Sequence, residues 1–161
     1  MEIKGSEFIE KMIDDFTMEN FGIHAVLDTE FLAYCEDKVI GYTYVYEEYA
    51  RDYFIKDAQK RFPEINADIF LWCLFHEIGH VMTNDVWTEA DTWYFAERKE
   101  ELANTIEDDQ TRFDLYHSIA DEYVATNWAG NFMKNHTDIV GDFWNRLQPA
   151  MQLMFFINDL I

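Results

Sequence analysis

The chain has few residues that interrupt regular structure, with only 6 glycines and 2 prolines among 161 residues. Its two cysteines, Cys35 and Cys73, form no CxxC pair and are too few for a disulfide framework. The longest uninterrupted apolar run, residues 69–75, is much shorter than the roughly 20 residues that span a bilayer. These absences predict a reduced, soluble protein without a transmembrane segment.

Basic residues are also scarce, since 12 Lys and Arg stand against 32 Asp and Glu, which leaves a formal charge of −20. Direct binding of nucleic acid or of an anionic membrane needs basic residues, so neither is expected as a partner. Residues 1–7 lack the basic start and apolar run of a secretory signal, which predicts a cytoplasmic location. The whole chain is 49% hydrophobic and rich in aromatic residues, enough for one substantial core spanning residues 1–161.

Hydrophobic periodicity predicts an α+β fold that is mostly helical, with a small antiparallel sheet in the N-terminal half. We expect Ser6 and Asn66 to be N-caps, Thr88 to begin a helix together with Asp91, and Pro149 to kink the last helix. The predicted helices cover residues 6–20, 47–61, 66–82, 88–104, 111–135 and 138–160, and the predicted strands cover 23–27, 31–35 and 39–46, with a hairpin turn at 36–38.

The residue pattern that points to chemistry is HExxH, at residues 76–80, within the most apolar predicted helix. Residues four apart share one helix face, so His76 and His80 can reach a single zinc ion (Zn2+). Glu77 can then act as the general base for a zinc-activated water. Gly79 leaves room for another element to approach closely. Unpaired polar groups are costly inside such a helix, which favours a metal over two core histidines.

A catalytic zinc site needs a third protein ligand. The extended HExxHxxGxxH form is absent, since Thr83 and Trp87 occupy its glycine and histidine positions. Cys73 shares the face of His80 but lies about 10 Å along the helix axis from it, which favours a core role.

The helix expected at 111–135 offers a carboxylate in a stripe of small residues, which permits close packing on a partner helix. The stripe consists of Ser118, Glu122, Ala125 and Ala129. Glu122 is therefore the predicted third ligand. Asp121 and the Glu89/Asp91 pair remain alternatives, as does a solvated surface position for Glu122.

Three further side chains are weaker candidates for catalysis. His117 lies four residues before Asp121, so it could orient a ligand or stabilise an oxyanion, although a surface ion pair is the more common arrangement. Tyr116 and Tyr123 are weaker oxyanion candidates of the same kind, and a core position is the expected arrangement for both.

The HEIGH sequence at 76–80, followed by EYVATNWA at 122–129, resembles the ImmA/IrrE family of zinc metallopeptidases. That family pairs HE(I/L)GH with a later helix of the form ExxAN-x-FA; here Thr126 replaces the Asn and Trp128 the Phe. The resemblance implies a zincin-like domain of gluzincin type. It also implies His76, His80 and Glu122 as zinc ligands, Glu77 as base, and a regulatory cleavage of a protein target.

The leading functional hypothesis is therefore a zinc metallopeptidase that hydrolyses a protein or peptide substrate. The alternatives are an acidic protein-binding module, or a nucleic-acid mimic, on a zincin-like scaffold. Residues 85–122 contain 12 acidic and 3 basic residues, which would favour basic substrates if they border the cleft and otherwise form a solvated face. The strands at 31–46 are expected to offer an edge to an extended peptide.

Overall fold

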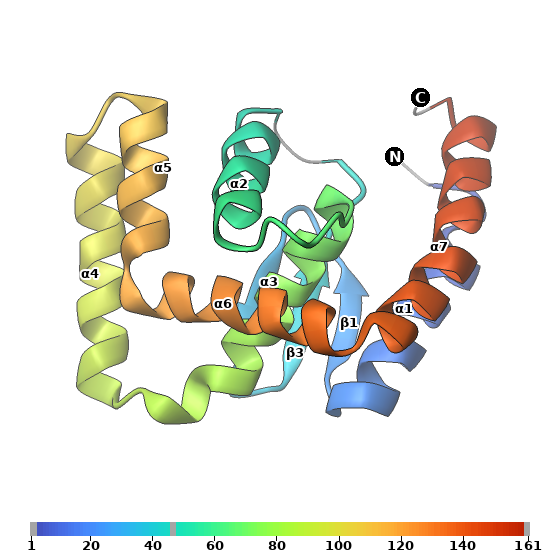
Figure 1. The fold of residues 1–161 in the computed structure, drawn as a ribbon, viewed down its shortest axis with the longest axis horizontal. Helices are drawn as coiled ribbons and strands as arrows, with labels where there is room; N and C mark the ends of the chain where they lie inside the picture. Colours follow the sequence, from blue (N-terminus) through green and yellow to red (C-terminus); the bar gives the residue numbers. More distant parts are fainter. Residues whose placement is uncertain (1–2, 46–47, 160–161) are drawn as a thin grey trace.

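The computed structural model describes residues 3–45 and 48–159, and for residues 48–51 the backbone alone. The fold is mostly helical with a small sheet in the N-terminal half, as predicted (Figure 1). Tyr46 and residues 47 and 160, at the ends of predicted elements, lie outside the described residues. In chain order the elements are α1 (Ser6–Phe21), β1 (His24–Leu27), β2 (Leu32–Tyr34), β3 (Val39–Tyr42), α2 (Glu48–Arg61), α3 (Ile69–Thr83), a 3-10 turn (Asn84–Val86), α4 (Glu89–Thr105), α5 (Asp109–Ser118), α6 (Ala120–Asn135) and α7 (Thr137–Ile157).

The sheet is mixed, and the prediction of a purely antiparallel sheet is wrong. Its strand order is β1-β3-β2, so β3 is central and the other two strands are edges. The β2–β3 hairpin is antiparallel as predicted, with its turn at residues 35–38 and Lys38 at a positive φ of 53°. β1 instead pairs with β3 in parallel, with His24 opposite Val39. Short connections favour antiparallel neighbours, but β2 does not pair with β1. The chain forms β2 at the far edge of the sheet and then returns through the hairpin, so that β3 lies between β1 and β2.

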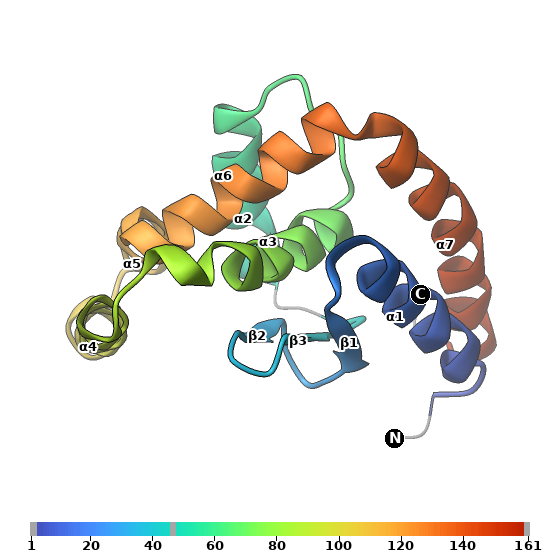
Figure 2. The ribbon, with the colours of Figure 1, turned by 90° about the horizontal axis from the view of Figure 1, so that it is seen from below.

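Helix α3 runs through the centre of the molecule, as its all-round apolar sequence predicts. Trp72, Leu74 and Phe75 are fully buried. The sheet lies on one side of α3 and α6 crosses the other (Figure 2). The histidines near the end of α3 are therefore covered by protein on both sides.

The helix predicted at residues 111–135 is two helices, α5 and α6. Ile119 separates them with an extended conformation, at φ −62° and ψ 138°. No glycine or proline lies at this position, so the hydrophobic pattern of the sequence gives no sign of the break. Ser118 is therefore not part of the stripe of small residues on α6, because it is the last residue of α5. Its hydroxyl donates to the Leu115 carbonyl within α5.

Two predicted helix starts are also wrong. The side chain of Asp68, not Asn66, caps α3 by accepting from the Phe70 backbone N–H. Gly5 is the N-cap of α1, while the Ser6 hydroxyl donates to Glu10 inside the helix. The predicted Thr88/Asp91 capping box at the start of α4 is confirmed.

Helices α4 and α5 form a hairpin at one end of the molecule (Figures 1 and 2). A second, small hydrophobic cluster holds it together, centred on Phe95, Leu102 and Ile119. At the other end, Pro149 lies inside α7, which continues to Ile157. In the part of the chain that the structure describes, no helix has the length and apolarity to cross a bilayer.

Candidate metal centre

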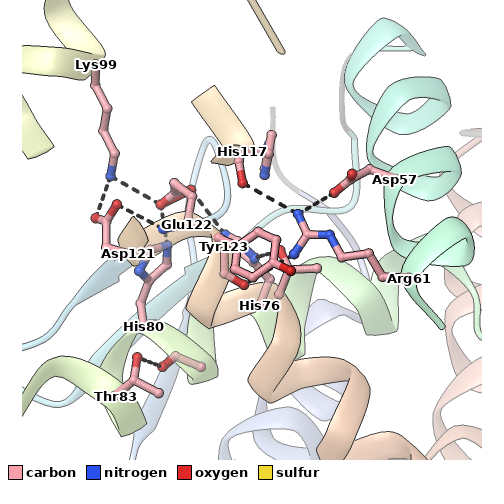
Figure 3. A network of polar contacts seen from close by, with 12 residues as sticks. Asp57, Arg61, His76, His80, Thr83, Lys99, His117, Asp121, Glu122 and Tyr123 are labelled. Atoms are coloured by element: carbon pink, nitrogen blue, oxygen red, sulfur yellow. Dashed lines mark hydrogen bonds and ion pairs between the residues drawn. The ribbon is translucent and has the colours of Figure 1, made fainter. Parts of the chain in front are cut away.

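Helices α3 and α6 bring His76, His80 and Glu122 together. The carboxylate of Glu122 faces both imidazoles, with its Oε1 3.2 Å from His76 Nε2 and its Oε2 2.6 Å from His80 Nε2 (Figure 3). One ligand atom from each of the three residues lies within 4.8 Å of the others. The two residues of the HExxH pattern and the predicted third ligand thus share one site.

The local structure explains why Glu122 reaches into the interior. Because α6 begins at Ala120, Glu122 lies in its first turn, where the positive end of the helix dipole favours a carboxylate. Gly79 of α3 and Ala125 of α6 allow the two helices to approach closely beside His80 and Glu122. Glu122 is consequently only 4% exposed, so it is not a solvated surface residue.

Burial, hydrogen bonds and neighbouring charges shift the pKa values of Glu122 and His80. Burial raises the pKa of Glu122, but hydrogen bonds from His76 and His80 outweigh it and the pKa lies well below its usual range. Burial lowers the pKa of His80, yet the hydrogen bond and charge of Glu122, with the charge of Glu77, raise it overall. Glu122 is therefore ionised and ready to bind a cation at neutral pH.

Thr126 supports the site from one helical turn further along α6. Its Oγ1 lies 2.9 Å from Nδ1 of His76, and its side chain is fully buried. Fixing Nδ1 leaves Nε2 of His76 facing Glu122, which is how a second hydrogen bond orients a histidine ligand. Sequence reasoning did not assign this role, although Thr126 is four residues from Glu122 and hence on the same helix face.

Glu77 is half-buried on α3, next to His76. Burial raises the pKa of its carboxyl, and the Glu122 charge adds to that effect, while His76, His80 and Lys99 lower it. The charged groups of the cluster and Lys99 therefore also shift the pKa of Glu77. A carboxylate with a raised pKa is better suited to accept and return a proton near neutral pH.

The alternative third ligands lie elsewhere. Asp121 is turned toward α4, where its Oδ2 is 2.7 Å from Lys99 Nζ, and its Oδ1 accepts from the Glu122 backbone N–H. Asp91 is used in the capping box at the start of α4. Glu89 is exposed in the same turn. None of these three carboxylates joins the group formed by His76, His80 and Glu122 among the described residues.

Lys99 is a charged neighbour of the site that sequence reasoning missed. Its Nζ lies 3.2 Å from Glu122 Oε2 as well as 2.7 Å from Asp121. Burial lowers the pKa of Lys99, but the two carboxylates raise it overall, so the ammonium group remains charged. The contact joins residues 23 positions apart on different helices, and no local pattern marks it.

His117 does not pair with Asp121, because the break at Ile119 places the two residues on different helices. Its ring lies among the rings of Phe54, Phe113 and His76, at centroid distances of 5.3, 4.1 and 5.8 Å. Burial, aided by the charges of His76 and Arg61, lowers the pKa of His117 to about 3. His117 is therefore a neutral neighbour of the cluster at physiological pH.

The two tyrosines differ from one another. Tyr123 is 46% exposed, so it is not a core residue. The Arg61 guanidinium carbon lies over its ring, 4.2 Å from the ring centroid. Tyr116 is half-buried, with its ring centroid 5.3 Å from Lys99 Nζ. Burial and the charges of Glu122, Glu77 and Asp121 raise the pKa of Tyr116, so its hydroxyl stays protonated beside the cluster.

Arg61, at the end of α2, secures the junction between α5 and α6. It pairs with Asp57 at 2.7 Å and donates to the backbone carbonyls of His117 and Tyr123 at 3.5 and 3.3 Å (Figure 3). These carbonyls lie on either side of Ile119. A single guanidinium thus stabilises the break that sets the direction of α6 and the position of Glu122.

The two cysteines lie outside the ligand group. Cys73 packs partly buried against the core, as expected, and burial raises its pKa. Cys35 follows β2, and its pKa is raised by burial and then by the charges of Glu77 and Asp121.

No protein-family model, curated protein or solved structure matches the chain. Two imidazole nitrogens and one carboxylate are the protein donor set of many catalytic zinc sites, which leave a further position open. The buried, ionised carboxylate and the oriented His76 fit that set. His76, His80 and Glu122 are thus the residues that could hold the metal.

Proposed function

We propose that the protein is a zinc-dependent metallopeptidase that hydrolyses peptide bonds in a protein target. The observation that carries this proposal is the convergence of His76, His80 and Glu122, with Glu77 on the turn between the two histidines. The similarity of residues 76–80 and 122–129 to the ImmA/IrrE family supports a zincin-like domain and a regulatory cleavage.

In the proposed reaction, His76, His80 and Glu122 would hold the zinc ion, which would supply Lewis-acid catalysis at the scissile carbonyl. A carboxylate oxygen of Glu77 accepts a proton from the attacking water and returns it to the departing amine nitrogen. Thr126 keeps Nε2 of His76 directed into the site. Tyr116, whose hydroxyl stays protonated beside the cluster, would donate to the developing oxyanion.

The edge strand β2 is the proposed binding position for the substrate chain. β3 is central in the sheet, so the strand edges open to a peptide belong to β1 and β2, and β2 packs near α3. An extended peptide would add to β2 through main-chain hydrogen bonds. Recognition of this kind favours unfolded or extended segments and depends little on individual side chains.

Metal content and hydrolysis test the proposal together. Protein purified without chelator should contain about one zinc per chain, and His76→Ala with His80→Ala should abolish it, because both imidazoles are donors. Glu122→Ala should weaken zinc binding strongly, whereas Asp121→Ala should weaken it far less, because Asp121 contacts Lys99 and lies outside the ligand group. A metal-free wild type, or metal retained in Glu122→Ala and lost in Asp121→Ala, would contradict the ligand assignment.

Hydrolysis separates the base from the ligands. Glu77→Gln should keep the fold and the zinc but lose about 10²- to 10⁴-fold in turnover of an unfolded protein substrate, since an amide cannot accept the proton. Metal loss in this variant would make Glu77 a ligand instead. Unchanged turnover would refute its role as base.

The net charge of −20 favours a second candidate, an acidic module that occupies a basic partner. The exposed acidic residues of α4 and α5 give this candidate its surface. Such a module would inhibit a DNA-binding partner stoichiometrically, and Glu77→Ala would inhibit equally well. A peptidase would act catalytically, and Glu77→Ala would be inactive.

A further inference from the structure

Lys99 connects the α4–α5 hairpin to the candidate metal centre. It projects from α4 to the start of α6, where its Nζ lies between Asp121 Oδ2, at 2.7 Å, and Glu122 Oε2, at 3.2 Å (Figure 3). Its side chain is only 25% exposed, and those of Asp121 and Glu122 are 16% and 5% exposed. The ammonium group is thus held in a largely enclosed position rather than on a solvated surface.

The same carboxylate is held from both sides. Glu122 Oε2 faces His80 at 2.6 Å, while Oε1 faces His76 at 3.2 Å. Lys99 approaches Oε2 from α4, and Asp121 anchors Lys99 while also accepting the backbone N–H of Glu122. Asp121, next to Glu122 in sequence, thus pairs with Lys99 and lies outside the group formed by the two imidazoles and Glu122.

We propose that Lys99 is a positioning residue for the third metal ligand, and that with Asp121 it forms a clamp that holds the Glu122 carboxylate against His76 and His80. This inference rests on the proposed metal-binding function. Partners that fix the orientation of a ligand typically change metal affinity 10- to 100-fold when they are removed. Glutamate has several rotatable bonds, so ordering its side chain on metal binding costs conformational entropy. A clamp that orders the side chain before the metal binds removes this cost from the binding step.

The competing explanation is that Lys99 acts only through its charge. A nearby ammonium group repels a divalent cation, so removing it alone would strengthen binding on electrostatic grounds. Lys99 and Asp121 carry opposite charges and form a pair. Replacing both by neutral residues therefore removes the clamp with little change in net charge, and isolates positioning from electrostatics.

The test compares Zn2+ affinity, measured by competition with a chromophoric chelator, in wild type and in Lys99→Met with Asp121→Asn. We expect the double variant to bind Zn2+ about 10- to 100-fold more weakly. Lys99→Arg, which can still donate to both carboxylates, should stay within about threefold of wild type. With Co2+ bound, the visible absorption spectrum of the double variant should differ from wild type, because the geometry of the Glu122 ligand changes.

A matched control lies on the same helix. Arg98 and Glu101 form an exposed pair at 2.9 Å, so Arg98→Met with Glu101→Gln makes the same change in charge away from the site. This control should keep wild-type affinity and spectrum. Lys99→Ser with Asp121→Asn repeats the test if the methionine variant does not fold by circular dichroism.

Two outcomes separate the inference from the proposed function. A wild type that binds Zn2+ with a double variant of equal affinity and spectrum overturns the clamp and leaves the function standing. A wild type that binds no Zn2+ overturns the function itself. Equal losses in the double variant and in the Arg98/Glu101 control would assign the effect to α4 stability and overturn the clamp.

Discussion

Gly79 of α3 and Ala125 of α6 meet backbone to backbone, and a methyl group on Gly79 would lie 2.6 Å from the Ala125 carbonyl oxygen. That distance is too short for a carbon atom, and a helix backbone cannot move without its neighbours. The contact lies one residue before His80 and three residues after Glu122. The spacing of the two helices at this point therefore sets the distance between the histidines and Glu122 of the candidate metal centre.

Gly79→Ala should push α6 away from α3. We expect a loss of about 1–3 kcal/mol in the free energy of unfolding, from overpacking, together with weaker metal binding. Gly141→Ala in α7 is the matched control, since a methyl group there meets nothing within 4 Å. It should be neutral or slightly stabilising, because alanine favours a helix by up to about 1 kcal/mol over glycine. Chemical denaturation and chelator competition measure both effects; equal behaviour of the two variants would contradict the close contact.

The sequence predicts the part of the site that depends on local spacing. His76 and His80 lie on one helix, where a separation of four residues fixes their relation. The alanine neighbours of Glu122 predict that its helix face packs on α3, and its carboxylate lies beside both imidazoles, although Ser118, assigned to the same stripe, lies on another helix. The contact of Gly79 with α6 could be predicted as well, because glycine in a helix of large apolar residues permits close approach.

Features that depend on contacts distant in sequence could not be predicted. Ile119 breaks the helix without a glycine or proline, and the carbonyls beside the break are bound by Arg61 of α2, more than 50 residues away. Lys99 on α4 and Glu122 on α6 are likewise joined by a tertiary contact between two helices. The parallel pairing of β1 with β3 likewise depends on which strand fills the centre of the sheet.

The hydrogen bond between His76 Nδ1 and Thr126 Oγ1 predicts a measurable effect on metal affinity. Thr126→Val keeps the shape of the buried side chain and removes the hydroxyl, so His76 loses the partner that orients its ring. We expect Zn2+ affinity to fall about 10- to 100-fold. Thr126→Ser retains a hydroxyl and should recover most of the affinity in the same chelator competition. Wild-type affinity in the valine variant would show that the ring needs no such partner.

His117 should make the metal-free protein less stable in acid. Its pKa is lowered to about 3 in the folded state, against an ordinary value of 6.5. Between these values the unfolded chain binds a proton that the folded protein does not, so the free energy of unfolding decreases as the pH falls. The contribution is about 1.4 kcal/mol per pH unit at most, or roughly 3 kcal/mol between pH 6.5 and 4.

His117→Phe removes this titration and also removes Nδ1, which is buried and has no hydrogen-bond partner among the described residues. The other ionisable groups of the site remain, so subtracting the two stability profiles isolates His117. Urea unfolding in the presence of chelator should give a flatter pH dependence for the variant below pH 6.5. Parallel profiles would show that His117 titrates alike in the folded and unfolded chains.

The acidic surface of the α4–α5 hairpin should favour basic substrates. Glu97, Glu100 and Glu101 are exposed on α4, the helix from which Lys99 reaches the candidate metal centre. A field of one sign beside a site attracts substrates of the opposite sign, and salt screens it over about 10 Å at 0.1 M. At low salt, kcat/KM for peptides containing Lys or Arg should exceed that for neutral peptides by about 10-fold, and the ratio should shrink as salt rises. Glu97→Lys should lower the ratio, whereas Glu19→Lys makes the same charge change on α1, which packs against β1 and α7 rather than the hairpin, and should not. A peptide library cleaved without preference for basic residues at low salt would refute this role of the hairpin.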